Sequence, residues 1–161
     1  MRTLYASILI MTIFAPDFAS VPSDILPAYR QAESRYPWVT RSLFNTVYQE
    51  SRRAGLDHAI ILAIIDAESR GKTRAVSPVG ARGLMQIMPL WHRGDPRELH
   101  DPVYNVRLGV RIFAGYARQA RGNVVKALKY YERGPRGKGF NGEYTAKIIN
   151  NYYGAIAYAE H

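Results

Sequence analysis

The sequence contains no cysteine among its 161 residues. That absence excludes a disulfide framework, a thiolate metal site and a cysteine nucleophile. Acidic residues are also scarce: 13 Asp and Glu stand against 22 Lys and Arg, which gives a net charge of +9. This excess favours an acidic partner, such as nucleic acid, an anionic membrane face or an anionic polymer, without choosing among them. Signals for β-strands are nearly absent, so we predict a mainly α-helical protein.

The length and the apolar content fit a single globular domain. Hydrophobic residues make up 47% of the chain, which is ordinary for a folded domain and too high for a disordered one. No repeat, low-complexity tract or long linker divides the sequence. We therefore expect one domain after the N-terminal segment.

The N-terminal segment has the pattern of a secretory signal peptide. A short positive start precedes an apolar run over residues 4–15, and the small residues Ala19 and Ser20 follow it. The run is shorter than the about 20 apolar residues of a transmembrane helix. We predict a signal peptide over residues 1–20, a mature domain over 21–161 and a periplasmic or secreted protein with no stable membrane anchor. The alternative is an N-terminal anchor that stays attached.

Capping residues and apolar spacing predict six helices in the mature domain. Their expected starts are Ser23, Thr40, Asp57, Asp101, Asn123 and about Glu143. The first helix is expected to end before Pro37, the second at Gly55, and the third at Ser69 with Gly71 beyond it. The fourth should end at about Ala120 and the fifth past Tyr131. Residues 71–94 carry glycines and prolines and indicate turns, with a short extended piece over 84–87.

Glu68 is the most informative side chain of the third predicted helix. It follows Ile61 by seven residues and Ile64 by four, so it points with the apolar face, whereas Asp66 falls elsewhere and is expected to be solvated. Burial and the negative end of the helix dipole both disfavour an ionised carboxylate. Both effects favour the protonated form that a general acid needs. The alternative is a helix-end glutamate that reaches water or pairs with Arg70, Lys72 or Arg74.

The segment after Glu68 carries a specific motif. Glu68-Ser69 is followed by Ser-Pro-Val-Gly-Ala-Arg-Gly-Leu-Met-Gln-Ile-Met-Pro over residues 77–89. This combination closely resembles the soluble lytic transglycosylases, which cleave bacterial peptidoglycan and share the goose-type lysozyme fold. The resemblance extends from about residue 55 to 150, with further matches at 101–109, at 127–135 and at Tyr144. It implies a compact helical domain of the lysozyme-like α+β superfamily, with a small irregular or β lobe and a cleft.

The resemblance also implies a mechanism with one carboxylate. Glu68 would protonate the glycosidic oxygen between N-acetylmuramic acid and N-acetylglucosamine, while the 2-acetamido oxygen of the substrate stabilises the anomeric carbon. Glu68, now ionised, would take the proton from the C6 hydroxyl, which closes onto C1 as a 1,6-anhydro end. A partly desolvated glutamate suits an acid that later acts as a base.

Other residues receive roles from the same resemblance. The candidate substrate-binding residues are Ser77, Met85, Gln86, Tyr131 and Tyr144, and the structural or cleft residues are Gly83, Met88 and Asn105. Each polar one has a structural alternative: a turn-capping hydroxyl for Ser77, a bond to the glycine-rich loop for Gln86, and core packing with a wet edge for the tyrosines. Both methionines either line the cleft or pack. Asn105 is expected to fix the start of its helix rather than to bind sugar.

The sequence departs from the family pattern at Glu132 and Arg133, where asparagine and alanine are usual. Glu132 is either a second carboxylate near the cleft, which raises the proton affinity of Glu68 by like-charge repulsion, or part of a surface pair with Arg133 or Arg136.

Two other functions remain as alternatives. A lysozyme-type hydrolase would need a base, for which Glu132 and Asp95 are the candidates. A non-catalytic basic domain could bind peptidoglycan or nucleic acid, but the cationic residues are dispersed and no nucleic-acid motif is present. We expect glycan strands of peptidoglycan as the partner, with a larger envelope-spanning apparatus as a further one, and no nucleic acid. The four histidines, His58, His92, His100 and His161, lack zinc-ligand spacing, so we expect no metal and no cofactor.

Overall fold

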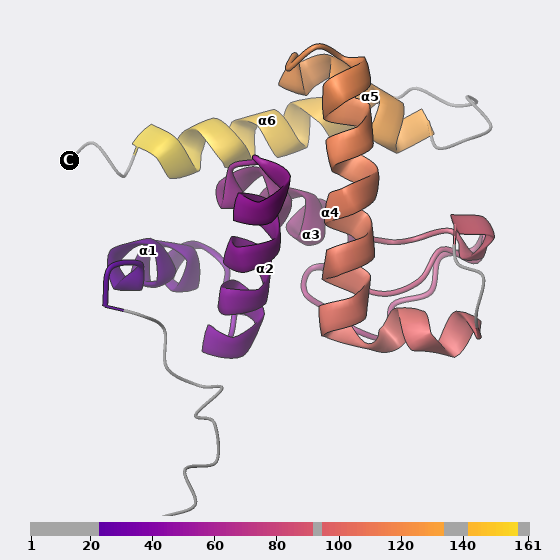
Figure 1. Cartoon of the computed structure of the whole chain (residues 1–161), viewed down its shortest axis with the longest axis horizontal. Helices are drawn as coiled ribbons and strands as arrows, with labels where there is room; N and C mark the ends of the chain where they lie inside the picture. Colours follow the sequence, from indigo (N-terminus) through magenta and orange to yellow (C-terminus); the bar gives the residue numbers. More distant parts are fainter. Residues whose placement is uncertain (1–22, 92–94, 134–141, 158–161) are drawn as a thin grey trace, which may run out of the picture.

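The computed structural model describes residues 23–91, 95–133 and 142–157. Within these ranges the chain forms six α-helices and two short 3-10 helices (Figure 1). They are α1 (Leu26–Arg35), α2 (Arg41–Ala54), α3 (His58–Ser69), η1 (Pro89–Trp91), η2 (Pro96–His100), α4 (Pro102–Gln119), α5 (Val124–Arg133) and α6 (Gly142–Ala157). The prediction of a mainly helical protein is confirmed.

Four of the predicted N-caps are confirmed. The side chains of Thr40, Asp57, Asp101 and Asn123 each accept a hydrogen bond from a backbone N–H group in the first turn of their helix. These bonds satisfy donors that the helix leaves without a partner. The cap at Ser23 is wrong: α1 begins at Leu26, and Ile25 precedes it without a side-chain cap. Here Pro27 favours the helix start through its fixed φ angle.

The C-terminal end of α3 differs in detail from the prediction. The left-handed residue that ends the helix is Arg70, with a φ of 51°, and Gly71 follows with a φ of 74°. A Cβ atom on Gly71 would lie 2.6 Å from the Trp38 side chain. Gly71 therefore allows both the turn and the close approach of Trp38 to the end of α3.

Helix α3 lies at the centre of the core. Residues 60–65 are all buried, so this helix is surrounded by protein on every side rather than along one face. It packs against α2 and α6, while α4 packs against α2 and α5. In Figure 1, α3 lies behind α2 and α4, and the yellow α6 runs above α2 toward the upper half of α4. A helix so enclosed holds its C-terminal residues in a fixed position.

The segment between α3 and η1 contains no strand. Two isolated bridges, Val76–Arg82 and Arg82–Ile87, are its only β pairings among the described residues. The predicted extended piece over 84–87 is wrong, because residues 83–86 form a turn. Isolated bridges supply few backbone hydrogen bonds, so other groups must hold this segment.

Asn105 of α4 holds this segment. Asn105 is fully buried. Its Oδ1 accepts from the N–H group of Met85 at 2.8 Å, and its Nδ2 donates to the carbonyls of Leu99 at 2.8 Å and Arg82 at 3.0 Å. Gly83 has a φ of 77°, and a Cβ there would lie 2.3 Å from Asn105 Nδ2. The expected role at the start of α4 thus belongs to Asp101, and the amide of Asn105 fixes the loop instead.

No helix in the described ranges has both the length and the apolar character needed to cross a membrane. The predicted signal peptide over residues 1–20 lies outside the described residues.

Candidate active site

The carboxyl group of Glu68 meets a phenol from a distant part of the chain. The O–H group of Tyr144 donates to Glu68 Oε1 at 2.5 Å, across a separation of 76 residues. Tyr144 lies on α6 four residues before Ile148, which is fully buried, so both share the face that packs on α3. The packing of α6 on α3 therefore brings the acid and the phenol together.

Burial gives Glu68 an unusual proton affinity. Loss of hydration, the largest cause, raises the pKa of Glu68 from its ordinary 4.5 to about 7. The hydrogen bond from Tyr144 lowers this pKa, the charge of Glu132 raises it, and the charge of Lys147 lowers it. Near neutral pH both forms of the carboxyl group are populated, as donation followed by acceptance of a proton requires. Over the described residues, Glu68 forms no ion pair with Arg70, Lys72 or Arg74.

Tyr131 adds a second phenol near Glu68. Its O–H group donates to the carbonyl of Met85 at 2.7 Å, and its ring packs edge-on against Phe113 and Tyr116. Burial first, and the charge of Glu68 second, hold the pKa of Tyr131 well above its usual range. Tyr131 therefore stays neutral and fixes the turn that carries Met85.

Ser77 and Gln86 both bond within the loop. Ser77 Oγ accepts from the N–H group of Ala81 at 3.0 Å, which is the turn-capping alternative. The Gln86 amide donates to the carbonyl of Gly83 at 2.9 Å and more weakly to that of Ala75 at 3.4 Å. These bonds hold Gln86 at a positive φ of 47°. Their substrate contacts stay predictions.

The two methionines occupy different environments. Met85 is fully buried, and a Cβ on Gly109 would lie 2.4 Å from its sulfur, so its side chain packs against α4. Of the two roles expected for Met85, packing is the one present. Met88 is half-buried, and its contact with the cleft stays a prediction.

Glu132 lies near the candidate site. Thr145 Oγ1 donates to Glu132 Oε2 at 3.4 Å, and the charge of Glu132 raises the pKa of both Glu68 and Tyr144. This agrees with the alternative of a second carboxylate near the site, whereas Arg136 of the surface-pair alternative lies outside the described residues. Two other residues near Glu68 and Glu132, namely Thr145 and Lys147, were not predicted, although both lie close to Tyr144 along α6.

Asp95 is a weak candidate for a base. Its carboxylate binds Arg97 through the side chain and the backbone N–H group, and these bonds lower the pKa of Asp95 to about 2. A carboxylate that holds protons so weakly is a poor base near neutral pH.

Asp66 is not solvated as expected. It accepts hydrogen bonds from Trp38 Nε1 at 3.1 Å and from Asn151 Nδ2 at 3.3 Å. Both partners are distant in sequence, so the spacing along α3 gave no signal for them. Asp66 thereby ties α3 to α6 and to the segment before α2.

Histidine and carboxylate side chains do not gather into a metal site in the part of the chain that the structure describes. His92 and His161 lie outside that part, so the expectation of no metal stays a prediction.

We expect substitutions around Glu68 to move its pKa in opposite directions. Tyr144→Phe removes a donor to the ionised carboxylate and should raise the pKa of Glu68. Glu132→Gln removes a like charge and should lower it. Carbon-13 NMR titration of the Glu68 carboxyl checks both. Shifts in the same direction would contradict this account.

The raised pKa of Glu68 also predicts a pH-dependent stability. Between pH 4.5 and 7 the folded protein binds more protons at this site than the unfolded chain, so stability falls as pH rises through that window. At pH 8 the loss amounts to at most about 3 kcal/mol. Glu68→Gln lacks this loss, so its melting temperature relative to the native protein should increase from pH 4 to pH 8. A difference independent of pH would contradict the raised pKa.

Comparisons with known proteins identify the family. The family described as the transglycosylase SLT domain matches residues 45–153. The soluble lytic murein transglycosylase of Salmonella typhimurium is 30% identical over 115 residues, which covers 64% of this chain and 17% of that protein. The structure of an inactive mutant of the lytic transglycosylase Slt from Pseudomonas aeruginosa has a TM-score of 0.57 and 28% identity, covering 76% of this chain and 23% of that one.

A second solved structure, the 70-kDa soluble lytic transglycosylase in complex with bulgecin A, has a TM-score of 0.56 and 25% identity. The matched region covers 80% of this chain and 21% of that transglycosylase. The chain therefore spans less than a quarter of the length of each of these relatives. The family match includes Glu68, the loop after α3, and Tyr144. By this match the chain belongs to the transglycosylase SLT domain family and has its lysozyme-like fold.

Proposed function

We propose that this chain is a lytic transglycosylase that cleaves the bond between N-acetylmuramic acid and N-acetylglucosamine in peptidoglycan. The observation that carries the proposal is the Glu68 carboxyl group, which has a pKa of about 7 and lies 2.5 Å from the O–H group of Tyr144. Its proton affinity suits acid and then base catalysis, and the bond from Tyr144 holds the carboxyl group in one place. Membership of the transglycosylase SLT domain family supports the substrate class.

The reaction needs no water. Protonated Glu68 donates to the glycosidic oxygen as the bond to C1 breaks, and the 2-acetamido oxygen of the same sugar stabilises C1. The ionised Glu68 then takes the proton of the C6 hydroxyl, whose oxygen bonds to C1 and yields the 1,6-anhydro end. Glu68 finishes protonated, as it began. The hydrogen bond from Tyr144 stabilises the ionised form between the two steps.

The location and the remaining contacts follow from this proposal. A periplasmic or secreted location, which the pattern over residues 1–20 predicts, would bring the protein to peptidoglycan. Ser77, Gln86 and Met88 would lie along the glycan strand.

Bulgecin A, which is bound by the 70-kDa relative, should bind this chain and raise its melting temperature. The same measurement on Glu68→Gln tests whether the carboxyl group contributes to this binding.

The second candidate function is hydrolysis, and Glu132 is the observation that favours it. Glu132 is half-buried, and its charge is close enough to Glu68 to raise the pKa of that residue. An inverting hydrolase uses such a second carboxylate to activate water. Glu132 would then be the base, and Glu68 only the acid.

Mass analysis of the products from purified sacculi separates the two functions. A transglycosylase yields ends that are one water lighter than those of a hydrolase and that resist borohydride reduction. We expect anhydro ends from the native protein and from Glu132→Gln. Reducing ends that disappear in Glu132→Gln would establish the hydrolase instead.

A further inference from the structure

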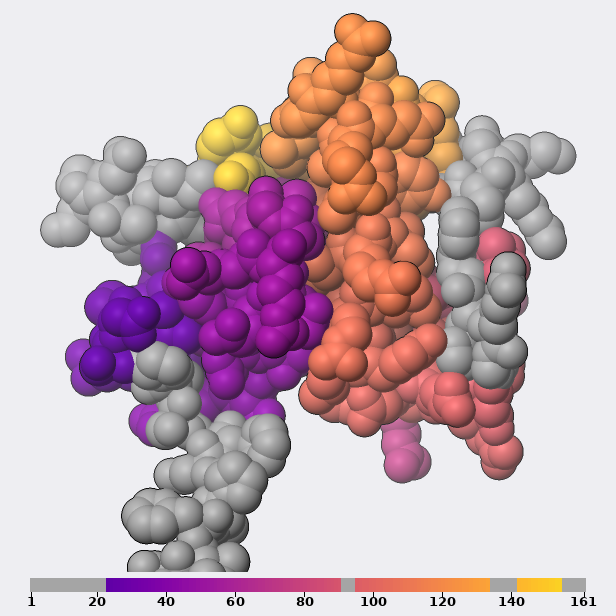
Figure 2. Space-filling view, in the orientation of Figure 1, coloured from indigo at the N-terminus to yellow at the C-terminus, as the bar shows by residue number. Residues whose placement is uncertain are grey.

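A hollow lined by arginines lies between α2 and α4. Its volume is about 550 Å³, and its charged residues are Glu50, Arg53, Arg107, Arg111 and Arg118, which we name the arginine groove. Figure 2 shows the purple surface of α2 and the orange surface of α4 meeting on this face. Four arginines and one glutamate leave an excess of three positive charges.

Glu50 organises half of the arginine groove. It is only 9% exposed, and its Oε1 accepts from Arg53 Nη1 at 2.8 Å and from Arg107 Nε at 3.2 Å. One carboxylate thus joins α2 to α4 and fixes two guanidinium groups. Because their remaining N–H groups are oriented in advance, less conformational entropy is lost when an anion binds.

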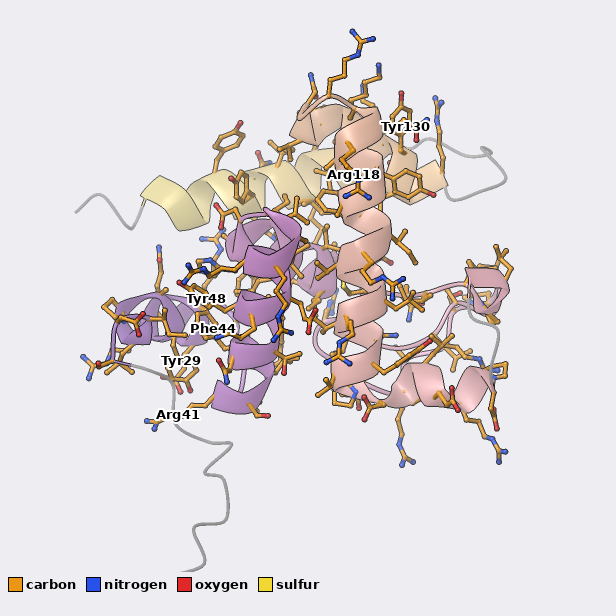
Figure 3. All side chains as sticks on the ribbon, viewed as in Figure 1. Tyr29, Arg41, Phe44, Tyr48, Arg118 and Tyr130 are labelled. Carbon is orange, nitrogen blue, oxygen red and sulfur yellow. The ribbon has the colours of Figure 1, made fainter. Side chains whose placement is uncertain are left out.

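Arg111 and Arg118 supply the uncompensated charge. Both are exposed on α4, and among the described residues no carboxylate pairs with either. Arg118 is labelled in Figure 3 on the face of α4 that is turned toward the viewer. The two arginines are seven residues apart, which corresponds to about 10 Å along the helix axis.

The arginine groove also has apolar walls. Ala54, Leu108 and Ile112 are half-buried and line the hollow together with the charged residues. A ligand that fills the hollow must therefore carry aliphatic groups as well as anionic ones.

The arginine groove is separate from the Glu68 site. All its lining residues come from α2 and α4, whereas Glu68, Tyr144 and Glu132 come from α3, α6 and α5. The proposed reaction uses none of its arginines.

We propose that the arginine groove binds an acidic, extended peptide segment of a partner protein. Guanidinium groups pair with carboxylates through two parallel hydrogen bonds, and the aliphatic side chains of such a segment fit the apolar walls. An extended chain advances about 3.3 Å per residue and points every second side chain to the same face. Carboxylates two and then four residues apart therefore share one face and lie within side-chain reach of Arg107, Arg111 and Arg118, and an aliphatic residue midway between the last two faces the apolar walls. A phosphate polymer offers nothing to the apolar walls, and a flat membrane surface does not enter a hollow.

A labelled peptide tests the assignment. The probe is a fluorescein-labelled peptide with glutamates two and then four residues apart and with a leucine midway between the last two. Its binding to the full chain is measured by fluorescence anisotropy. Arg111→Gln with Arg118→Gln should weaken binding by at least about tenfold, through loss of two charge-assisted contacts. Arg30→Gln with Arg41→Gln changes exposed arginines on α1 and at the far end of α2 and removes the same charge, so it should change binding by less than about twofold.

Three outcomes would overturn the proposal. Equal weakening by the two pairs of substitutions would show attraction by net charge alone. Polyphosphate or phosphatidylglycerol vesicles that bind as tightly as the peptide, and that lose affinity in the Arg111 and Arg118 variant, would assign a phosphate-bearing ligand to the groove. A variant of Arg111 and Arg118 whose lytic activity on sacculi falls by the same factor as its peptide binding would make the groove a wall-binding site. If the Arg111 and Arg118 variant keeps lytic activity within about twofold of the native protein, a separate partner is supported. Glu68→Gln should lose activity but keep peptide binding, so the two proposals can fail independently.

Discussion

Glu68→Gln should reduce the release of anhydromuropeptides from sacculi by about 10³-fold. General acid–base catalysis typically contributes about 10²–10⁴-fold, and in the proposed mechanism one carboxyl group performs both proton transfers. Glutamine keeps the size of the side chain and can still accept from Tyr144, but it donates no acidic proton to the glycosidic oxygen. The measurement is the initial rate of product release, followed by mass analysis.

Glu33→Gln is the matched control for this experiment. Glu33 also accepts a tyrosine O–H group, from Tyr29 at 2.6 Å, but it lies exposed on α1. The control removes the same charge and should keep activity within about twofold. Retention of more than a tenth of the native rate in a folded Glu68→Gln protein would remove Glu68 from the centre of the mechanism.

Asn105→Ala should lower the free energy of unfolding by about 3–5 kcal/mol. The substitution leaves the N–H group of Met85 and the carbonyl of Leu99 without their partner, and each buried unpaired group costs about 1–3 kcal/mol. The carbonyl of Arg82 loses one of two bonds and keeps the one from the N–H group of Ile87 at 2.9 Å. This is a large part of the total stability of a typical domain, which is about 5–15 kcal/mol. Urea unfolding followed by circular dichroism gives the difference.

Asn123→Ala provides the comparison for Asn105→Ala. Asn123 is an exposed N-cap whose loss should lower the free energy of unfolding by about 1 kcal/mol. Gly83→Ala tests the same region of the loop, because its Cβ would lie within 2.3 Å of Asn105 Nδ2 at a positive φ. Equal, small effects of Asn105→Ala and Asn123→Ala would mean that the loop is held by other groups.

Local signals predicted the helices well. A cap such as Thr40 or Asp101 satisfies donors within three residues, so both partners stand side by side in the sequence. The sequence located the end of α3 at Gly71 but did not reveal that Arg70 also adopts a positive φ, nor that Gly71 is needed for the close approach of Trp38 as well as for the turn. The absence of strands in the loop also needed the structure, since apolar runs alone do not separate turns from short strands.

Contacts between distant residues were beyond the reach of the sequence. The apolar spacing of α3 predicted a buried carboxyl at Glu68, but the phenol at Tyr144 came from resemblance to a family. Asp66 was expected in solvent because its partners Trp38 and Asn151 belong to other segments. The loop-holding role of Asn105 was missed for the same reason.

The separation of Glu68 and Tyr144 has a consequence for a chain that is still being synthesised. The carboxyl group is made 76 residues before the phenol, and α6 supplies part of the surroundings that exclude water from it. Until α6 docks, the carboxyl group is more exposed to water, and its pKa lies closer to the ordinary value of a glutamate. The raised proton affinity of Glu68, on which the proposed activity depends, therefore arises only after α6 has been made and has packed on α3.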